Sequence, residues 1–394
     1  MLQGQSEPLY AGFMSAVSRD LTQGFLPPED PLTRLPDVFE DWEQIGDELS
    51  KLALSRHIRP VIQNLPPFPI DQLETLREHE RAMTLLSFIA NMYVYAPDHG
   101  VAKSIPRNLA QAWCAIAKRL DRLPMLTYAS QVMYNWRRFE PASPYEVGNI
   151  HKDQNIFWGK DDEWFVTIHV HIEAVAGQAL SELIPGQKAV LRSEPEVILN
   201  CLAAVTETLH KMRAILKRIT ERCEPNTYYH RVRPYMFGWK NNPELPDGMV
   251  YSGVEAYGEI PQQFRGETGA QRSVIYAIGG FLGIEHGYDE MRAYLMEMRD
   301  YMPAQDRHFI EIVERGPSVR QFIIEQHSKL PELKEKYNSA VDALYEFRRM
   351  HIEYAAMYVL APGKRENKGQ VGTGGTPFTA VSYTHLTLPT NREV

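Results

Sequence analysis

His351 is the residue whose position most suggests metal chemistry. It lies within an apolar stripe of helical spacing that includes Leu344, Phe347 and Tyr358. A buried imidazole needs a partner, because an unpaired buried polar group costs on the order of 1–3 kcal/mol. One interpretation is a core histidine bonded to a backbone carbonyl, and spacing alone favours it. The other is an axial ligand of a haem iron, which suits a rigid helix and a dry environment.

Two further histidines, His169 and His171, form a His-x-His pair in the segment WFVTIHVHIEAVAGQAL. On a strand both side chains would point the same way and chelate one metal. On a helix they lie on opposite sides. The surrounding pattern is helical, so we do not expect joint chelation. One of the two remains a candidate to face a binding pocket, and the helix phase near Glu173 decides which.

Arg233 and a glycine-rich stretch are candidates for binding an anion. Arg233 lies among aromatic residues in RVRPYMFGWKNNP and can hold a carboxylate through two parallel hydrogen bonds. Its alternative role is a structural ion pair. The stretch GTGGT at 372–376 offers backbone amides, but it lacks the lysine and the preceding strand of a phosphate loop. A nucleotide site is therefore not indicated, and a flexible linker is the other interpretation.

The elements that must position these residues carry the helical period. The clearest begins with a capping box, Ser193 and Glu196, and continues as an apolar stripe from Val197 to Ile219. Sustained alternation of the strand type is scarce, so we predict an all-α protein. Further helices are expected at 35–54, 71–95, 109–120, 126–136, 162–183, 269–301 and 340–360.

Pro-, Gly- and Asn-rich loops separate the helices, and the polar stretch 141–155 is the best domain boundary. We predict a small helical domain at 1–140, a linker at 141–155 and a large helical domain at 156–380. The last residues, VSYTHLTLPTNREV at 381–394, are Thr-rich and have no helical period. One set of codons for 381–390 spells a sequencing adapter, so we interpret this tail as non-native read-through. An ordinary disordered tail is the alternative.

Composition narrows the class of protein. The 394 residues contain 42 basic and 50 acidic side chains, a net charge of −8, with both signs scattered. This balance argues against a nucleic-acid or anionic-membrane partner. We find no secretory signal and no apolar run of about 20 residues. The cysteines Cys114, Cys201 and Cys223 are odd in number and widely spaced, which is typical of reduced thiols in a cytoplasmic protein.

Along nearly all of residues 9–380, the chain resembles the indoleamine 2,3-dioxygenase family. The segments that carry the resemblance occur in the family's order and at roughly its spacing. They are LPDVFEDW, SIPRNLAQAW, LPMLTYASQVMYNW, WFVTIHVHIEAVAG, RPYMFGWKNNPELPDGMVY, FRGETGAQRSV, MRDYMPAQDRHFI, GPSVRQFI, FRRMHIEYAAMYVL and GTGGT. Together they are far more specific than any single motif.

The resemblance implies two helical domains with haem b between them, held mostly by the large C-terminal domain. His351 matches the family's proximal histidine and is expected to ligate the iron. Arg348, one helical turn earlier, matches an arginine that contacts a haem propionate. Thr268, Gly269 and Ala270 match a loop that lies against the haem.

The resemblance also implies a substrate site. Arg233 matches the arginine that pairs with the amino-acid carboxylate, and Thr373 matches a loop threonine near the substrate's amino group. The residues expected to line the indole pocket are Tyr128, Val132, Phe165 and Tyr228.

Three features depart from the better-known animal enzymes. His169 stands where those enzymes have a small hydroxyl residue, and it is the candidate catalytic residue, bonding the indole N–H. Tyr228 replaces a phenylalanine and adds a hydroxyl. The third departure follows GTGGT, where the family continues into a C-terminal helix and this sequence does not.

The activity implied is insertion of both atoms of O₂ across the indole C2–C3 bond of L-tryptophan or a related indoleamine, giving N-formylkynurenine. An electron donor is needed to keep the iron ferrous. One alternative is a haem-based gas sensor that binds O₂ without turnover, which would not need Arg233 or GTGGT. Others are a diverged relative that acts on a modified tryptophan and a helical scaffold that has lost haem, the last argued against by His351 and Arg348.

Overall fold

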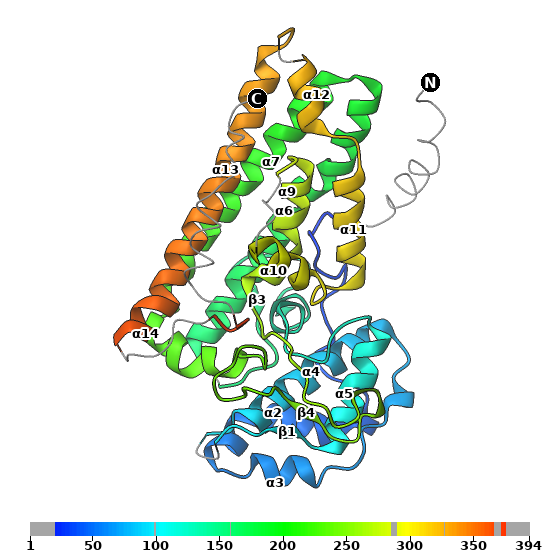
Figure 1. Cartoon of the computed structure of the whole chain (residues 1–394), viewed down its shortest axis with the longest axis vertical. Helices are drawn as coiled ribbons and strands as arrows, with labels where there is room; N and C mark the ends of the chain where they lie inside the picture. Colours follow the sequence, from blue (N-terminus) through cyan, green and yellow to red (C-terminus); the bar gives the residue numbers. More distant parts are fainter. Residues whose placement is uncertain are drawn as a thin grey trace.

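The computed structural model describes residues 20–97, 100–157, 159–284, 290–326, 328–365 and 372–375. Across these residues the chain is built almost entirely from helices, so the all-α prediction is confirmed (Figure 1). The α-helices are α2 (Glu40–Leu54), α3 (Ile58–Gln63), α4 (Leu76–Val94), α5 (Arg107–Arg119), α6 (Lys160–Arg192), α7 (Pro195–Lys217), α8 (Pro225–Thr227), α9 (Ser273–Phe281), α10 (Glu290–Arg299), α11 (Ala304–Arg315), α12 (Val319–Gln326), α13 (Pro331–Ala355) and α14 (Ala361–Arg365).

Strands contribute little to the described part of the chain. β1 (Ser104–Ile105) pairs in parallel with β4 (Val250–Tyr251), and β2 (Arg137–Arg138) pairs antiparallel with β3 (Ile150–His151). Three wider, π-helical turns interrupt the helical pattern, at Ala129–Met133, Tyr228–Val232 and Ala356–Leu360. Such turns are frequent at functional sites. Two of them contain predicted pocket residues, and the third follows the helix of His351.

The buried apolar residues form two main cores. One lies among α2, α3, α4 and α5 and contains Trp42 and Trp113, together with Tyr251 from much later in the chain. The other includes residues of α6, α7, α9, α11 and α13, with Leu180 and Leu209 among its fully buried side chains. In Figure 1 these cores correspond to the lower and upper parts of the molecule. The domain division at 141–155 stays a prediction.

The long helices α6, α7 and α13 pack against one another and form the frame of the upper part (Figure 1). The capping box predicted at Ser193 is wrong. Ser193 adopts a left-handed conformation with φ of 55° and ends α6, while Pro195 occupies the first turn of α7. The apolar stripe that follows is buried from Ile198 to Ile219, as its spacing indicates, but Val197, its predicted first member, is 37% exposed.

Two other expected helices differ from the structure. At 126–136 the chain forms only the short π-helical turn Ala129–Met133. The single helix expected at 269–301 is divided into a 3-10 turn at Gly269–Gln271, α9 and α10. Gly283, with φ of 63°, ends α9, because glycine adopts the left-handed conformation at a helix C-terminus without steric cost.

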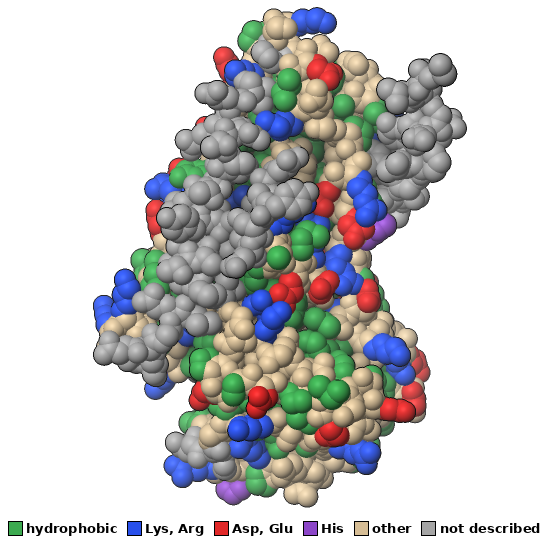
Figure 2. Space-filling view, in the orientation of Figure 1, with side chains coloured by type: hydrophobic (Ala, Val, Ile, Leu, Met, Phe, Trp, Pro, Cys, Tyr) green, Lys and Arg blue, Asp and Glu red, His purple; other side chains and the backbone are tan. Residues whose placement is uncertain are grey.

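The surface carries charges of both signs. Figure 2 shows lysine, arginine, aspartate and glutamate side chains interspersed over the described part of the visible face. Within the described residues, no helix combines the length and the apolar character needed to cross a membrane. The tail predicted at 381–394 lies outside the described residues.

Candidate active site

His351 lies in the last turns of α13, directly before the π-helical turn Ala356–Leu360. Burial lowers its pKa to about 4, and the positive charge of Arg272 lowers it further. A Cβ atom built on Gly269 would lie 3.0 Å from His351 Nε2. Glycine therefore leaves open the space next to this nitrogen. The imidazole is neutral at physiological pH, which is the form that ligates a metal.

The turn at 268–270 lies next to His351 through Gly269. The Thr268 hydroxyl accepts a hydrogen bond from the backbone N–H of Ala270 at 3.5 Å and caps the turn. The carbonyl oxygen of Ala270 accepts a bond from the Tyr276 hydroxyl at 2.8 Å. Both ends of the turn are thus fixed.

Arg348 is a buried cation. It lies one turn before His351 and is 9% exposed, and a Cβ built on Gly279 would lie 3.5 Å from its Nη2 atom. No hydrogen bond or ion pair of Arg348 is found among the described residues. Burial lowers its pKa to about 10, although Tyr276 opposes the shift. A buried guanidinium without a counter-charge is costly, so this position suits an anionic group of a ligand.

His169 faces the same region from α6. Its Nδ1 donates a hydrogen bond to the carbonyl oxygen of Phe165 at 2.7 Å, so Nε2 carries the lone pair and can accept. Burial lowers its pKa to about 3, and the charges of Arg272 and His351 add to this effect.

His171 lies in a different environment. It is half-buried, and burial and the positive charge of Arg218 lower its pKa, while Glu146 opposes the shift. His169 is therefore the member of the pair that shares its surroundings with His351.

Aromatic rings surround His169. Phe165 packs on the His169 ring with centroids 4.3 Å apart and on Tyr228 at 4.9 Å. Tyr128 meets His169 edge-on at 6.3 Å. Val132, fully buried, lies one helical turn from Tyr128. We call Tyr128, Val132, Phe165 and Tyr228 the aromatic cluster. The structure thus brings Tyr128 and Phe165 against His169, and Tyr228 against Phe165.

A buried hydrogen-bond network, which we call the Glu173 network, fixes Tyr128. Glu173 Oε1 accepts bonds from the Tyr128 hydroxyl at 2.8 Å and from Arg272 Nε at 2.7 Å. Arg272 Nε also approaches the Tyr128 oxygen at 3.1 Å, and the Tyr128 backbone N–H donates to Gln271 at 2.9 Å. Sequence reasoning gave Arg272 no role. The sequence feature that could have identified Arg272 is its position, a cationic residue two positions after the turn at 268–270.

Arg233 begins a 3-10 turn that follows the π-helical turn containing Tyr228. Its guanidinium is buried and lies 5.0 Å from the ring centroid of Tyr229 and 4.6 Å from that of Phe237. Burial lowers its pKa, and Tyr229 and Tyr228 oppose the shift. Two aromatic faces therefore hold a planar cation in a fixed orientation.

The described part of the glycine-rich stretch, residues 372–375, packs on the loop that contains Glu267. The Thr373 hydroxyl donates to the carbonyl oxygen of Glu267, and the Thr373 carbonyl accepts from the Gly238 N–H at 3.2 Å. Arg265 Nη1 donates to the Gly374 carbonyl at 2.8 Å. Thr373 is thereby tied to the segment that precedes the turn at 268–270. Thr376 lies outside the described residues.

A second buried polar group, which we call the Glu267 cluster, consists of Gln131, Lys152, Asp162 and Glu267. Lys152 forms an ion pair with Asp162, and Gln131 Nε2 donates to Asp162 at 3.3 Å. Burial raises the pKa of Glu267 to about 7, with Asp162 adding to the shift and Lys152 opposing it. Sequence reasoning missed these residues, because their types alone did not distinguish them from surface residues.

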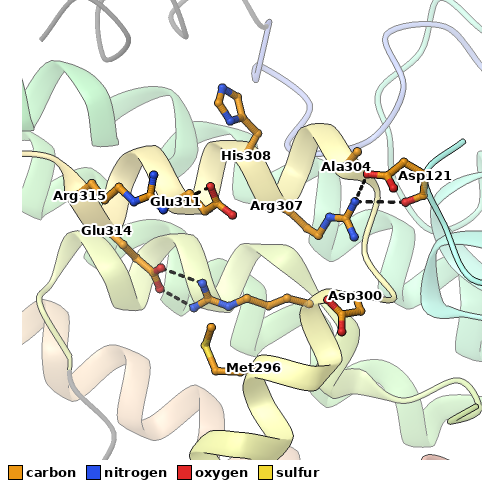
Figure 3. A pocket seen from close by; sticks show the side chains of 10 residues that line it. Asp121, Met296, Asp300, Ala304, Arg307, His308, Glu311, Glu314 and Arg315 are labelled. Atoms are coloured by element: carbon orange, nitrogen blue, oxygen red, sulfur yellow. Dashed lines mark hydrogen bonds and ion pairs between the residues drawn. The ribbon is translucent and has the colours of Figure 1, made fainter. Parts of the chain in front are cut away.

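The molecule also has a surface hollow, which lies apart from these residues. It has a volume of about 510 Å³ and lies beside α11, next to Met296, Asp300 and His308 (Figure 3). Its charged groups pair among themselves, with Arg299 Nη1 bonded to Glu314 at 2.8 Å and Arg307 to Asp121. It contains none of the predicted site residues, so we do not assign the active site to it.

Comparison with known proteins agrees with the resemblance. Residues 16–385 match the family model described as indoleamine 2,3-dioxygenase. Rat indoleamine 2,3-dioxygenase 1 is 32% identical over 367 residues, covering 90% of this chain and 89% of the relative. Human indoleamine 2,3-dioxygenase 2 is 29% identical, with 90% and 88% covered. A Fusarium equiseti relative, 6-hydroxytryptophan 2,3-dioxygenase, is also 29% identical, with 90% and 87% covered.

The chain belongs to the indoleamine 2,3-dioxygenase family. It is an oxidoreductase, a dioxygenase of tryptophan or a related indoleamine that uses O₂. Enzymes of this family are haem-dependent.

Proposed function

We propose that this chain binds haem b between its two cores and converts L-tryptophan or a related indoleamine to N-formylkynurenine or the corresponding product. When bound, the haem supplies the iron at which O₂ is activated. The protein's task is then to hold the iron, to orient the indole and to exclude water. An external electron donor keeps the iron ferrous.

The residues around His351 fit such a cofactor. His351 provides one neutral imidazole, and Gly269 leaves space beside Nε2. A single neutral histidine would suffice to hold haem, because haem iron is held by one proximal histidine in many proteins. Arg348 is the cation that we assign to a haem propionate, and the turn at 268–270 would pack against the haem.

The substrate's charged end is assigned to Arg233 and Thr373. Arg233 would pair with the carboxylate, because its guanidinium is desolvated and sandwiched between two rings. Thr373 would approach the amino group from the segment packed on Glu267. The indole would lie among the residues of the aromatic cluster.

His169 is assigned to the indole N–H. Its Nδ1 already donates to Phe165, so Nε2 is an acceptor. With a pKa of about 3 the imidazole is a weak base. His169 would therefore orient the ring by accepting a hydrogen bond and would not remove the proton.

The observation that best supports this proposal is the pair of neutral histidines, the half-buried His351 of α13 and the buried His169 of α6, whose pKa values are both lowered by burial and by Arg272. The test is an absorption spectrum of the purified protein with and without L-tryptophan and reductant, followed by an assay for N-formylkynurenine. Haem binding and a tryptophan-dependent spectral change with product formation are expected. Haem binding without any product would favour the gas sensor.

A modified tryptophan is the second candidate substrate. The Fusarium relative is named for 6-hydroxytryptophan, and this name supports a ring-substituted tryptophan as a substrate. We also place the enzyme in the cytoplasm, since Cys114, Cys201 and Cys223 are free thiols and reduced thiols are typical of that compartment.

A further inference from the structure

Three consecutive carbonyl groups in the glycine-rich stretch 372–375 each accept a hydrogen bond from another part of the chain. The donors and acceptors are the Gly238 N–H to Thr373 at 3.2 Å, Arg265 Nη1 to Gly374 at 2.8 Å and Asn241 Nδ2 to Gly375 at 3.0 Å. Glycine loses more conformational freedom on ordering than any other residue. A stretch of this composition therefore depends on such bonds to keep one position.

The same stretch fits closely against its surroundings. Gly375 has a φ of 72°, and a Cβ atom built on it would lie 2.2 Å from the carbonyl oxygen of Lys240. A Cβ atom built on Gly374 would lie 3.1 Å from Thr268 Cγ2. The lack of side chains at 374 and 375 thus lets the backbone approach both Lys240 and the turn at 268–270.

Arg265, the charged donor among the three, is itself fixed on several sides. It is 7% exposed, and its Nη2 atom pairs with Glu297 on α10 at 3.0 Å. Its guanidinium lies 5.0 Å from the ring centroid of Tyr294, and its backbone N–H donates to the Tyr301 hydroxyl at 2.8 Å. Glu297 also pairs with Lys240 at 2.6 Å. The two arms of one guanidinium therefore join α10 to the glycine-rich stretch.

The hydroxyl of Thr373 is left as an acceptor. It donates its proton to the carbonyl oxygen of Glu267, so its oxygen keeps its lone pairs for another partner. A protonated amino group only donates hydrogen bonds, and it is the substrate group to which Thr373 is assigned. The strength of such a bond depends on where the hydroxyl oxygen lies, and the backbone bonds of 373–375 determine that position.

We propose that Arg265, anchored by Glu297, is a positioning residue that holds Thr373 where its hydroxyl oxygen accepts a hydrogen bond from the substrate's amino group. The inference rests on the proposed function, which places that amino group next to Thr373. Arg265 acts through the backbone of Gly374 and does not touch the substrate. Its contribution should therefore favour indoles with an amino group over indoles without one.

The test compares two ligands of the haem-loaded protein, L-tryptophan and indole-3-propionate, which has the same ring and a carboxylate but no amino group. The affinity for each is measured from the change that it causes in the haem spectrum, and the ratio of the affinities isolates the amino group. Thr373→Ala, which removes the accepting oxygen, should lower this ratio roughly tenfold. Arg265→Met, which removes the donors, should lower it roughly three- to tenfold.

A double-mutant cycle shows whether Arg265 acts through Thr373. If it does, Arg265→Met should have little further effect on the ratio in the Thr373→Ala background, because the hydroxyl that it positions is already absent. An effect of Arg265 on the fold in general would instead lower the affinity for both ligands and leave the ratio unchanged.

Arg59→Met is the matched control. Arg59 also lies over a tyrosine, 5.6 Å from the ring centroid of Tyr93, and also donates to backbone carbonyls, those of Tyr93 and Val94, both at 3.0 Å. These bonds are at the end of α4, and none of them involves the glycine-rich stretch. Arg59→Met should therefore keep the wild-type ratio.

Amide hydrogen exchange tests the position of the stretch without any substrate. In the haem-loaded protein, a peptide that contains residues 372–375 should exchange faster in Arg265→Met than in the wild type, and at the wild-type rate in Arg59→Met. Glu297→Gln keeps the shape of its side chain but weakens the anchor, so it should give smaller changes in the same direction in both measurements.

Three outcomes would overturn the inference: a wild-type ratio in Arg265→Met, an equal loss in the Thr373→Ala background, or unchanged exchange. If Arg265→Met does not fold, Glu297→Gln decides the matter, and wild-type values in both measurements would contradict the inference. The proposed function fails separately: it is wrong if the haem-loaded wild-type protein forms no ring-opened product from L-tryptophan or from a related indoleamine.

Discussion

The Glu173 network and the Glu267 cluster each bury a carboxylate beside the same aromatic rings, yet they differ in how that carboxylate is satisfied. Glu173 accepts hydrogen bonds from Tyr128 and Arg272. Glu267 accepts none from the described residues, and burial raises its pKa to about 7. Buried polar groups in folded proteins are nearly always paired. The first group is thus a complete framework that holds Tyr128, whereas no partner of the Glu267 carboxylate is found among the described residues.

The two buried arginines near His351 show the same contrast. Arg272 has Glu173 as an ion-pair partner; burial lowers its pKa, but Tyr128 and Glu173 together outweigh burial, so the pKa is raised. Arg348 has no partner among the described residues, and burial lowers its pKa to about 10. Pairing therefore distinguishes Arg272, which is part of the framework, from Arg348, which we assign to an anionic group of the haem. Each prediction below tests one side of this division.

The largest effect is expected for His351→Ala, which removes the proposed iron ligand. The purified variant should lack stoichiometric haem or contain haem without a histidine ligand. Haem per chain and the Soret band measure this. His171→Ala is the control and should retain haem, because on α6 the side chain of His171 lies on the opposite side of the helix from His169. A His351→Ala protein with the wild-type Soret band and turnover would remove His351 from the iron.

Arg272→Met tests the paired side. It leaves the Glu173 carboxylate buried without its cation, which should lower the free energy of unfolding by about 3–5 kcal/mol. Urea denaturation of the haem-free protein measures the loss. The double variant Arg272→Met with Glu173→Leu should recover most of it, because no charge is then left unpaired. If the double variant is less stable than the single one, the pair is not the unit that we describe.

Glu267→Gln tests the Glu267 carboxyl through the pH dependence of the free energy of unfolding. Because the pKa is about 7 in the folded protein and 4.5 in the unfolded chain, the folded state holds this proton more tightly. Its contribution to stability is therefore present below pH 4.5 and is lost as the pH rises through 7. The loss is about 3 kcal/mol, and Glu267→Gln should abolish it. The free energy of unfolding of both proteins, measured without substrate from below pH 4.5 to above pH 7, gives the difference. If both proteins show the same pH dependence, Glu267 has a partner in the folded state.

Arg233→Ala should reduce kcat/KM for L-tryptophan by a factor that corresponds to about 2–4 kcal/mol, as for the loss of one partner of a desolvated charge pair. Haem content should be unchanged. Arg233→Lys keeps the charge but not the planar fork, so it should recover only part of the activity. Turnover of Arg233→Ala within a few-fold of wild type would place the carboxylate site elsewhere.

The sequence alone predicted what depends on local pattern and on family motifs. The all-α fold and the buried stripe from Ile198 to Ile219 follow from helical spacing. Local signals also misled: Ser193 and Glu196 resemble a capping box, but the genuine one is formed by Thr75 and Glu78 at the start of α4. The two motifs have the same spacing, and only the tertiary path of the chain distinguishes them.

The two polar groups were beyond sequence reasoning, because their members meet only in the folded chain. Glu173 and Arg272 are 99 residues apart, and Gln131 and Asp162 are 31 apart. Whether such a residue is paired is a property of its partner's position. A local sequence pattern therefore cannot show which buried polar residues have a partner in the folded chain.

The smallest effect is expected for His169→Ser, because His169 is half satisfied: Nδ1 is bonded to Phe165, and only Nε2 is left for a substrate. Loss of a neutral hydrogen bond to the indole N–H should cost about 1 kcal/mol in kcat/KM. 1-Methyltryptophan, which lacks this N–H, should lose less than tryptophan does. With a pKa of about 3, His169 stays neutral at physiological pH, so the variant and the wild type should share one pH profile. His171→Ser is the control and should behave as wild type. Complete loss of activity in His169→Ser with haem intact would instead indicate an essential base, and no effect on either substrate would remove His169 from the indole site.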